Sequence, residues 1–178
     1  MTPLAYIALF GWIPLVVVLF STLPGRQAAT FAVVGAWLIL PPYSLSVSGL
    51  PDYSKNLAAS LGMLAGTLIF APDRLLSFRP RWFDYPMLGY CLCGIVSSLQ
   101  NELGIYDGLS DALSTSVSWG LPYLFGRLYL GDPEGLYFFA KGMVIGGLWY
   151  VLPCLYEVRM SPQLLGNFYG MGRWQGLR

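Results

Sequence analysis

The stretch from Pro3 to Leu23 reads PLAYIALFGWIPLVVVLFSTL and contains no charged residue. A helix of about 20 residues is long enough to cross the hydrocarbon core of a bilayer, which is roughly 30 Å thick. Similar apolar runs recur along the chain, and short segments between them hold most of the charge. The sequence therefore predicts an all-α, polytopic transmembrane helical bundle.

Six apolar runs are predicted to be the membrane spans of this bundle. Their predicted bounds are Pro3 to Leu23, Ala28 to about Val47, Asn56 to Pro72, Tyr85 to Leu99, Ala112 to Leu130, and Gly135 to Tyr156. In this interpretation residues 1–156 form the transmembrane helical region. Residues 157–178 form an extra-membrane C-terminal segment.

Composition supports a membrane protein and excludes several other classes. Hydrophobic residues make up 56% of the chain and charged residues only 11%, against about 25% charged in a typical soluble domain. Ten basic and nine acidic side chains nearly cancel, so no charge excess predicts a nucleic-acid partner. The chain has no histidine, which disfavours zinc chemistry and Ser-His catalysis. No cofactor and no metal ion are expected.

Charge placement predicts the orientation in the membrane. Basic residues favour the cytoplasmic side of short loops, and the densest cluster is Arg74, Arg79 and Arg81, between the third and fourth runs. We therefore expect this loop to be cytoplasmic. The loop from Asn101 to Asp111 and the tail after Tyr156 are then both external.

Two pairs of glycines have the four-residue spacing that lets membrane helices approach closely. They are Gly62 with Gly66 and Gly142 with Gly146. The pattern predicts ordinary helix packing at both pairs.

Four charged residues are candidate binding groups, each with a simpler alternative. Arg127 lies near the end of an apolar run, where an ionisable residue is a functional candidate or snorkels to the headgroups. Asp107 lies in the acidic external loop, which is suited to binding sugar hydroxyls or is merely solvated. Arg159 follows Glu157 in the segment CLYEVRMSPQL, residues 154–164. Arginine forks onto phosphate through two parallel hydrogen bonds, although an interfacial anchor also explains this segment.

Three segments of the chain resemble the bacterial O-antigen polymerase and O-antigen ligase superfamily. They are Asp107-Gly108-Leu109-Ser110, Leu121-Pro122-Tyr123 with Gly126-Arg127-Leu128-Tyr129, and Tyr156-Glu157-Val158-Arg159-Met160-Ser161-Pro162-Gln163-Leu164 with Tyr169-Gly170. The resemblance implies a multi-pass glycosyltransferase of the bacterial inner membrane. Such a protein transfers glycan from an undecaprenyl-diphosphate carrier on the periplasmic face, in O-antigen or exopolysaccharide synthesis.

The resemblance also implies roles for individual residues and partners. Arg159, Arg127, Glu157 and Asp107 would bind the lipid diphosphate or its glycan, and Arg159 would stabilise the departing diphosphate in place of a metal. The sequence assigns no catalytic base. The expected partners are lipid-linked oligosaccharide, membrane lipids, and a missing C-terminal half or other membrane subunits. Because family members are longer, the chain is expected to be an N-terminal half that is inactive alone.

Two other classes of function remain open from the sequence. Spans broken by proline, as at Pro122 and Pro153, also suit the substrate cavity of a transporter or flippase component. The paired glycines also suit a structural membrane subunit that only packs against partners.

Overall fold

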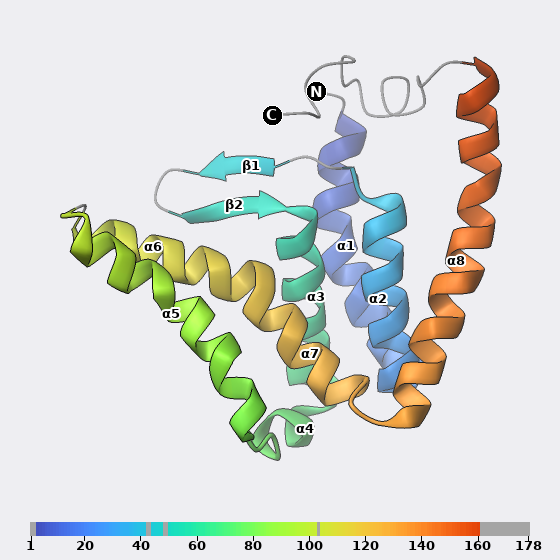
Figure 1. The fold of residues 1–178 in the computed structure, drawn as a ribbon. Helices are drawn as coiled ribbons and strands as arrows, with labels where there is room; N and C mark the ends of the chain where they lie inside the picture. Colours follow the sequence, from blue (N-terminus) through green and yellow to red (C-terminus); the bar gives the residue numbers. More distant parts are fainter. Residues whose placement is uncertain (1–2, 42–43, 48–49, 103, 161–178) are drawn as a thin grey trace.

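The computed structural model describes residues 3–41, 44–47, 50–102 and 104–160, and they are mostly helical (Figure 1). The elements are α1 (Pro3–Thr22), α2 (Gly25–Ile39), β1 (Ser44–Val47), β2 (Leu50–Ser54), α3 (Lys55–Phe70), α4 (Pro72–Leu76), η1 (Trp82–Asp84), α5 (Tyr85–Gln100), α6 (Ile105–Thr115), η2 (Ser116–Gly120), α7 (Leu121–Tyr129) and α8 (Pro133–Met160). The prediction of a helical chain is confirmed. It is incomplete in one respect, because β1 and β2 form an antiparallel hairpin.

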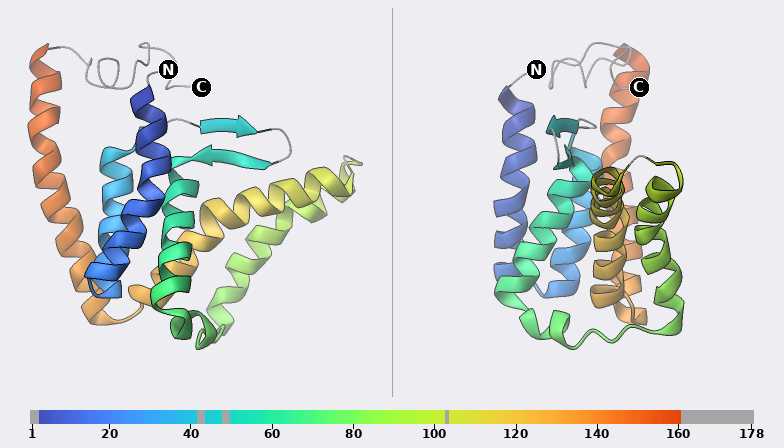
Figure 2. Two further views of the ribbon diagram at one scale, coloured as in Figure 1. Left: turned by 180° about the vertical axis from the view of Figure 1, so that it is seen from behind. Right: turned by 90° about the vertical axis from the view of Figure 1, so that its left-hand side faces the viewer.

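The centre of the fold is formed by α1, α2 and α3, which stand side by side (Figure 2). A Cβ atom added to Gly62 would lie 3.0 Å from Val16 Cβ, and one added to Gly66 would lie 2.6 Å from the ring of Phe20. The absent side chains therefore let α3 approach α1 closely, as predicted from the glycine spacing. The buried residues of α1 recur at the interval of one helix face. They are Ala5, Leu9, Trp12, Val16 and Phe20.

The predicted second span, Ala28 to about Val47, is wrong at its C-terminal end. The helix α2 ends at Ile39, and Leu40 has an extended backbone with ψ of 138°. The residue before a proline is disfavoured in the α region, and Leu40 precedes Pro41. The chain then enters β1 of the hairpin. Tyr53 on β2 holds the hairpin to α1, because its hydroxyl donates to the Leu9 carbonyl oxygen at 3.1 Å.

The segment from Asn101 to Asp111, predicted as a loop, is mostly helical, so the loop prediction is wrong. Its external location stays a prediction. The helices α5 and α6 pack against each other as a hairpin that projects from the bundle (Figure 1). Residue Gly104, with φ of +99°, precedes the start of α6 at Ile105. A positive φ of this kind is accessible mainly to glycine. Asp107 stands in the first turn of α6, where a negative charge is stabilised by the helix dipole.

The last helix, α8, lies along the outer side of α2 (Figure 1). A Cβ on Gly142 would meet Thr30 Cγ2 at 2.5 Å, and a Cβ on Gly146 would meet Leu38 Cδ1 at 2.8 Å and Val34 Cγ1 at 3.0 Å. The second glycine pair is thus also confirmed as a helix-packing site. Elsewhere the other described residues leave most of α8 exposed, and no residue of its most apolar window is buried.

Two of the described helices, Pro3–Thr22 and Pro133–Arg159, are long and apolar enough to cross a membrane. Helix α3 is also apolar but has 16 residues, which corresponds to roughly 24 Å of helix against a hydrocarbon core of about 30 Å. The prediction of apolar helices is confirmed for these segments. The finer prediction of six spans stays a prediction.

The boundary predicted between residues 156 and 157 falls inside a helix. Helix α8 continues to Met160, so residues 157–160 extend it. Residues 161–178, most of the predicted C-terminal segment, lie outside the described residues.

Candidate functional site

Arginines gather at the end of the molecule where α2 and α8 begin and α7 ends. Arg74, Arg79 and Arg81 come from the segment between α3 and α5, Arg26 from the start of α2, and Arg127 from the last turn of α7. Together they line an open cavity of ≈ 520 Å³, which we call the arginine cavity. Its other lining residues are Ser77, Phe78, Leu128, Gly131 and Asp132.

Arg127 is held at this cavity by the carboxylate of Asp84. Its Nε donates to Asp84 Oδ1 at 3.1 Å and its Nη2 to Oδ2 at 3.5 Å, while its guanidinium lies 4.5 Å above the ring centre of Phe83. The Tyr123 hydroxyl also donates to Oδ1, at 2.5 Å, and the backbone N–H of Arg81 donates to Oδ2 at 2.7 Å. Four donors therefore satisfy one buried carboxylate.

The pKa of the Asp84 carboxyl is lowered from its usual value. The main cause is the hydrogen bond from Tyr123, followed by the Arg81 backbone N–H, while Arg127 adds a further hydrogen bond and a favourable charge interaction. Hydrogen bonds to the ionised form favour that form. Asp84 is therefore a charged structural acceptor at neutral pH rather than a general acid.

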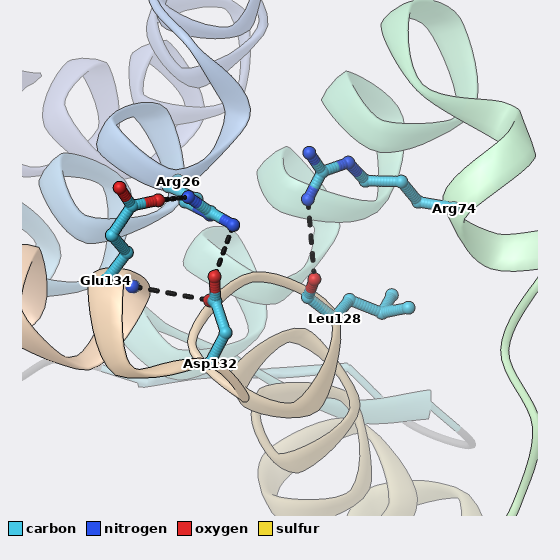
Figure 3. Close-up of polar contacts among 6 residues, drawn as sticks. Arg26, Arg74, Leu128, Asp132 and Glu134 are labelled. Carbon is cyan, nitrogen blue, oxygen red and sulfur yellow. Dashed lines mark hydrogen bonds and ion pairs between the residues drawn. The ribbon is translucent and has the colours of Figure 1, made fainter.

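Arg26 is neutralised by one acid from the turn before α8 and one from the first turn of α8. Its guanidinium forms ion pairs with Asp132 and with Glu134, one on each side (Figure 3). The Asp132 carboxylate also accepts the Gly135 backbone N–H at 3.3 Å, which satisfies a free donor at the start of α8. This arrangement joins α2 to the first turn of α8.

Arg74 reaches across the same end of the fold without an acidic partner. Its Nη1 donates to the Leu128 carbonyl oxygen at 3.5 Å (Figure 3), and its guanidinium lies 5.2 Å from the ring centre of Tyr129. The Tyr129 hydroxyl in turn lies 2.9 Å from Thr67 Oγ1. Among the described residues, the ion pairs are confined to Arg26 and Arg127.

A second, apolar cavity of ≈ 330 Å³ lies between α5, η2 and α7, and we call it the apolar cavity. Phe78 lines both cavities. Asp84 lines the apolar cavity and Arg127 lines the arginine cavity. The ion pair between these two residues therefore joins the wall of one cavity to the wall of the other. The remaining lining residues are Pro80, Met87, Leu88, Cys91, Ser116, Val117, Gly120, Leu121, Tyr123 and Leu124.

The structure separates the four binding residues predicted from the sequence. Arg127 lines the arginine cavity, whereas Arg159 is exposed in the last turn of α8, where Glu157 is partly exposed. From Asp132 to Arg159 the helix covers roughly 40 Å. Asp107 is exposed on α6. A single site formed by all four residues is not present in the described part of the chain.

Sequence reasoning missed the three acids that organise this end of the molecule, Asp84, Asp132 and Glu134. Asp84 is 43 residues from Arg127, and Asp132 is 106 residues from Arg26. Separations of this size leave no periodic pattern in the sequence. The sequence offers one weak signal, because Asp84 follows Arg79 and Arg81 closely and Asp132 follows Arg127 closely. Among the described residues no group of three or more Cys, Asp or Glu residues could hold a metal ion.

Comparisons with known proteins add no assignment to this geometry. No protein family, no curated protein and no solved structure matches the chain. The resemblance to O-antigen polymerases and ligases therefore stays an expectation. No family is assigned to the chain.

Proposed function

We propose that the chain belongs to a multi-pass protein of the bacterial inner membrane that acts on undecaprenyl-diphosphate-linked oligosaccharide. The proposed activity is the glycan transfer of O-antigen polymerases and ligases, in the synthesis of cell-surface polysaccharide. The six apolar runs serve as its spans, and the shorter helices are matched by thinning of the bilayer, by snorkelling of flanking residues or by association with neighbouring segments. The resemblance in sequence supplies the reaction class.

The observation that best supports this proposal is the uncovered apolar surface of α8. The side chains of Leu148, Trp149 and Leu152 are 66%, 73% and 61% exposed. Exposed apolar faces of this extent are unstable in water and are expected where lipid or another membrane helix covers them. When α8 spans the membrane, Glu157 and Arg159 lie at the membrane surface opposite the one at which the arginine cavity lies.

The chemistry proposed for that surface is binding of the carrier's diphosphate by Arg159. Its guanidinium is exposed, and the described residues offer it no ion pair. A phosphate that receives a forked pair of charged hydrogen bonds gains about 1.5–3 kcal/mol. Fixed positive charge of this kind stabilises a departing diphosphate without a metal ion.

The test measures binding of undecaprenyl-diphosphate-linked oligosaccharide to the protein in phosphatidylcholine nanodiscs. Arg159→Ala is expected to weaken binding by about 1.5–3 kcal/mol, and Arg159→Lys is expected to restore only part of this loss. Lys141→Ala is the matched control, because Lys141 is an exposed cation on the same helix. Unchanged affinity in folded Arg159→Ala protein would refute the role of Arg159.

The transporter or flippase alternative gains support from Arg127, a half-buried cation beside two cavities. It predicts movement of lipid-linked oligosaccharide between leaflets in vesicles that contain the protein, without growth of the glycan. The alternative of a structural subunit was based on the two glycine pairs, which would be free to pack against partner proteins. The structure does not favour it. Both glycine pairs are already occupied by contacts within the chain, with α1 and with α2.

A further inference from the structure

The arginine cavity has more positive charge than its own acids neutralise. Of its five arginines, Arg26 and Arg127 form ion pairs with carboxylates. The described residues offer no ion pair to Arg74, Arg79 or Arg81, all of which are exposed. Three guanidinium groups at one mouth attract an anion, and planar guanidinium groups match the oxygens of a phosphate.

The apolar cavity lies directly beside this positive mouth. Phe78 contributes to both walls, and Pro80 of the apolar cavity stands between Arg79 and Arg81 of the arginine cavity. A free phosphate ion would use only the arginine cavity. A ligand that fills both cavities has an anionic head attached to a hydrocarbon chain.

The surface around the mouth is suited to the membrane interface. Leu76 is 84% exposed and Trp82 is 80% exposed, on either side of Arg79 and Arg81 in the chain. Tryptophan is enriched at the level of the lipid headgroups, where its ring and its N–H are both accommodated. An amphiphile that reaches this mouth therefore comes from the adjoining leaflet.

We propose that the arginine cavity and the apolar cavity together bind one anionic phospholipid. The phosphate contacts Arg74, Arg79 and Arg81, and one acyl chain enters between α5 and α7 beside Leu88 and Val117. This inference rests on the membrane location in the proposed function but not on glycan transfer. Its site lies at the opposite end of α8 from Arg159.

Retention of phosphatidylglycerol, measured by native mass spectrometry of the detergent-solubilised full chain, tests the head of this site. One retained lipid is expected, with phosphatidylcholine bound more weakly. Arg79→Ala and Arg81→Ala are each expected to weaken retention by about tenfold. Lys141→Ala, which removes an exposed cation elsewhere, is expected to leave it unchanged. Equal retention by the doubly substituted Arg79→Ala, Arg81→Ala protein would overturn the proposal.

Substitutions in the apolar cavity test the tail of the site. Val117→Trp and Leu88→Trp are each expected to reduce phosphatidylglycerol retention, and Val144→Trp on the exposed surface of α8 is the control. Inorganic phosphate should compete only at much higher concentration than the lipid. Competition by inorganic phosphate at equal concentration, or full retention in both folded tryptophan variants, would refute the chain-binding cavity.

Arg159→Ala separates this inference from the proposed function. It is expected to leave phosphatidylglycerol retention unchanged while weakening the binding of lipid-linked oligosaccharide. The doubly substituted Arg79→Ala, Arg81→Ala protein is expected to weaken phosphatidylglycerol retention and to leave the binding of lipid-linked oligosaccharide unchanged. If Arg159→Ala abolished phosphatidylglycerol retention, the lipid would bind at the far end of α8 and the inference would be wrong, whatever the outcome for glycan binding.

Discussion

Helices α7 and α8 follow one another in the chain, yet they meet the rest of the molecule in opposite ways. Phe125 and Tyr129 of α7 are 2% and 1% exposed, and its polar side chains reach Asp84 of η1 and Thr67 of α3. Helix α8 approaches α2 through Gly142 and Gly146 while most of its large side chains face outward. The difference indicates that α7 is fixed by the chain's own core, whereas α8 depends on its surroundings.

The largest expected effect tests the core side of this comparison. Phe125→Ala should lower the free energy of unfolding by about 3–5 kcal/mol, because it leaves a cavity in the packed centre. Trp149→Ala on α8 should change it by only about 0.5 kcal/mol, as is usual for exposed positions. Denaturation of both variants in one detergent measures the two values. Equal losses would mean that α8 is packed as tightly as α7.

A smaller effect is expected where α8 touches α2. Gly146→Leu adds a side chain whose Cβ would lie 2.8 Å from Leu38 Cδ1, so we expect a loss of about 1–3 kcal/mol from overpacking. The adjacent Gly147 has no neighbouring atom within 4 Å of an added Cβ. Gly147→Leu is therefore the matched control and should be neutral or slightly stabilising, since leucine favours the helix. A loss at Gly147 equal to that at Gly146 would show that α8 packs differently.

The smallest expected effect concerns the polar contact that holds α7 to η1. Because the pKa of Asp84 is lowered in the folded protein, its contribution is fully present above the unfolded pKa of about 3.9. It is lost as the pH falls through the folded pKa. Asp84→Asn should therefore lower the melting temperature at neutral pH, and the difference from the unsubstituted protein should shrink below about pH 4. Asp107→Asn, at an exposed position on α6, is the control. A difference that is constant with pH would exclude ionisation of Asp84 as its cause.

Elements held by local patterns were predictable, and those set by distant partners were not. The apolar runs that begin at Pro3 and at Gly135 predicted α1 and α8, and the glycine pairs predicted the two packing sites, because period and spacing act within one helix. Helix α2 was predicted too long since apolar composition outweighed the signal of Pro41. Residues 105–111 were predicted as a loop from their acids and glycines, whereas they lie in α6, where a Cβ added to Gly108 would stand 2.9 Å from Ser98 Cβ of α5.

The residues of the candidate site also fall into those that the sequence predicted and those that it did not. Arg127 was predicted because an arginine near an apolar run is conspicuous by itself. Its partner Asp84 and the pairing of Arg26 with Asp132 depend on how α2, η1 and α7 converge. That convergence is a property of the whole fold, which the local sequence does not contain. The prediction for Arg159 follows from composition and resemblance, and the part of the resembling segment after Met160 lies outside the described residues.

The π turn η2, between α6 and α7, has a consequence for how this chain tolerates the loss of a residue. Such a turn holds one residue more than a regular helical turn, and the Ser60 hydroxyl donates to the Val117 carbonyl oxygen within it at 3.4 Å. Removing one residue from Ser116–Gly120 would convert the run into a continuous α-helix and rotate α7 by about 100°. Arg127 would then turn away from Asp84, and Phe125 would leave the core. A single-codon deletion here therefore changes which face of α7 is buried, although every remaining residue stays helical.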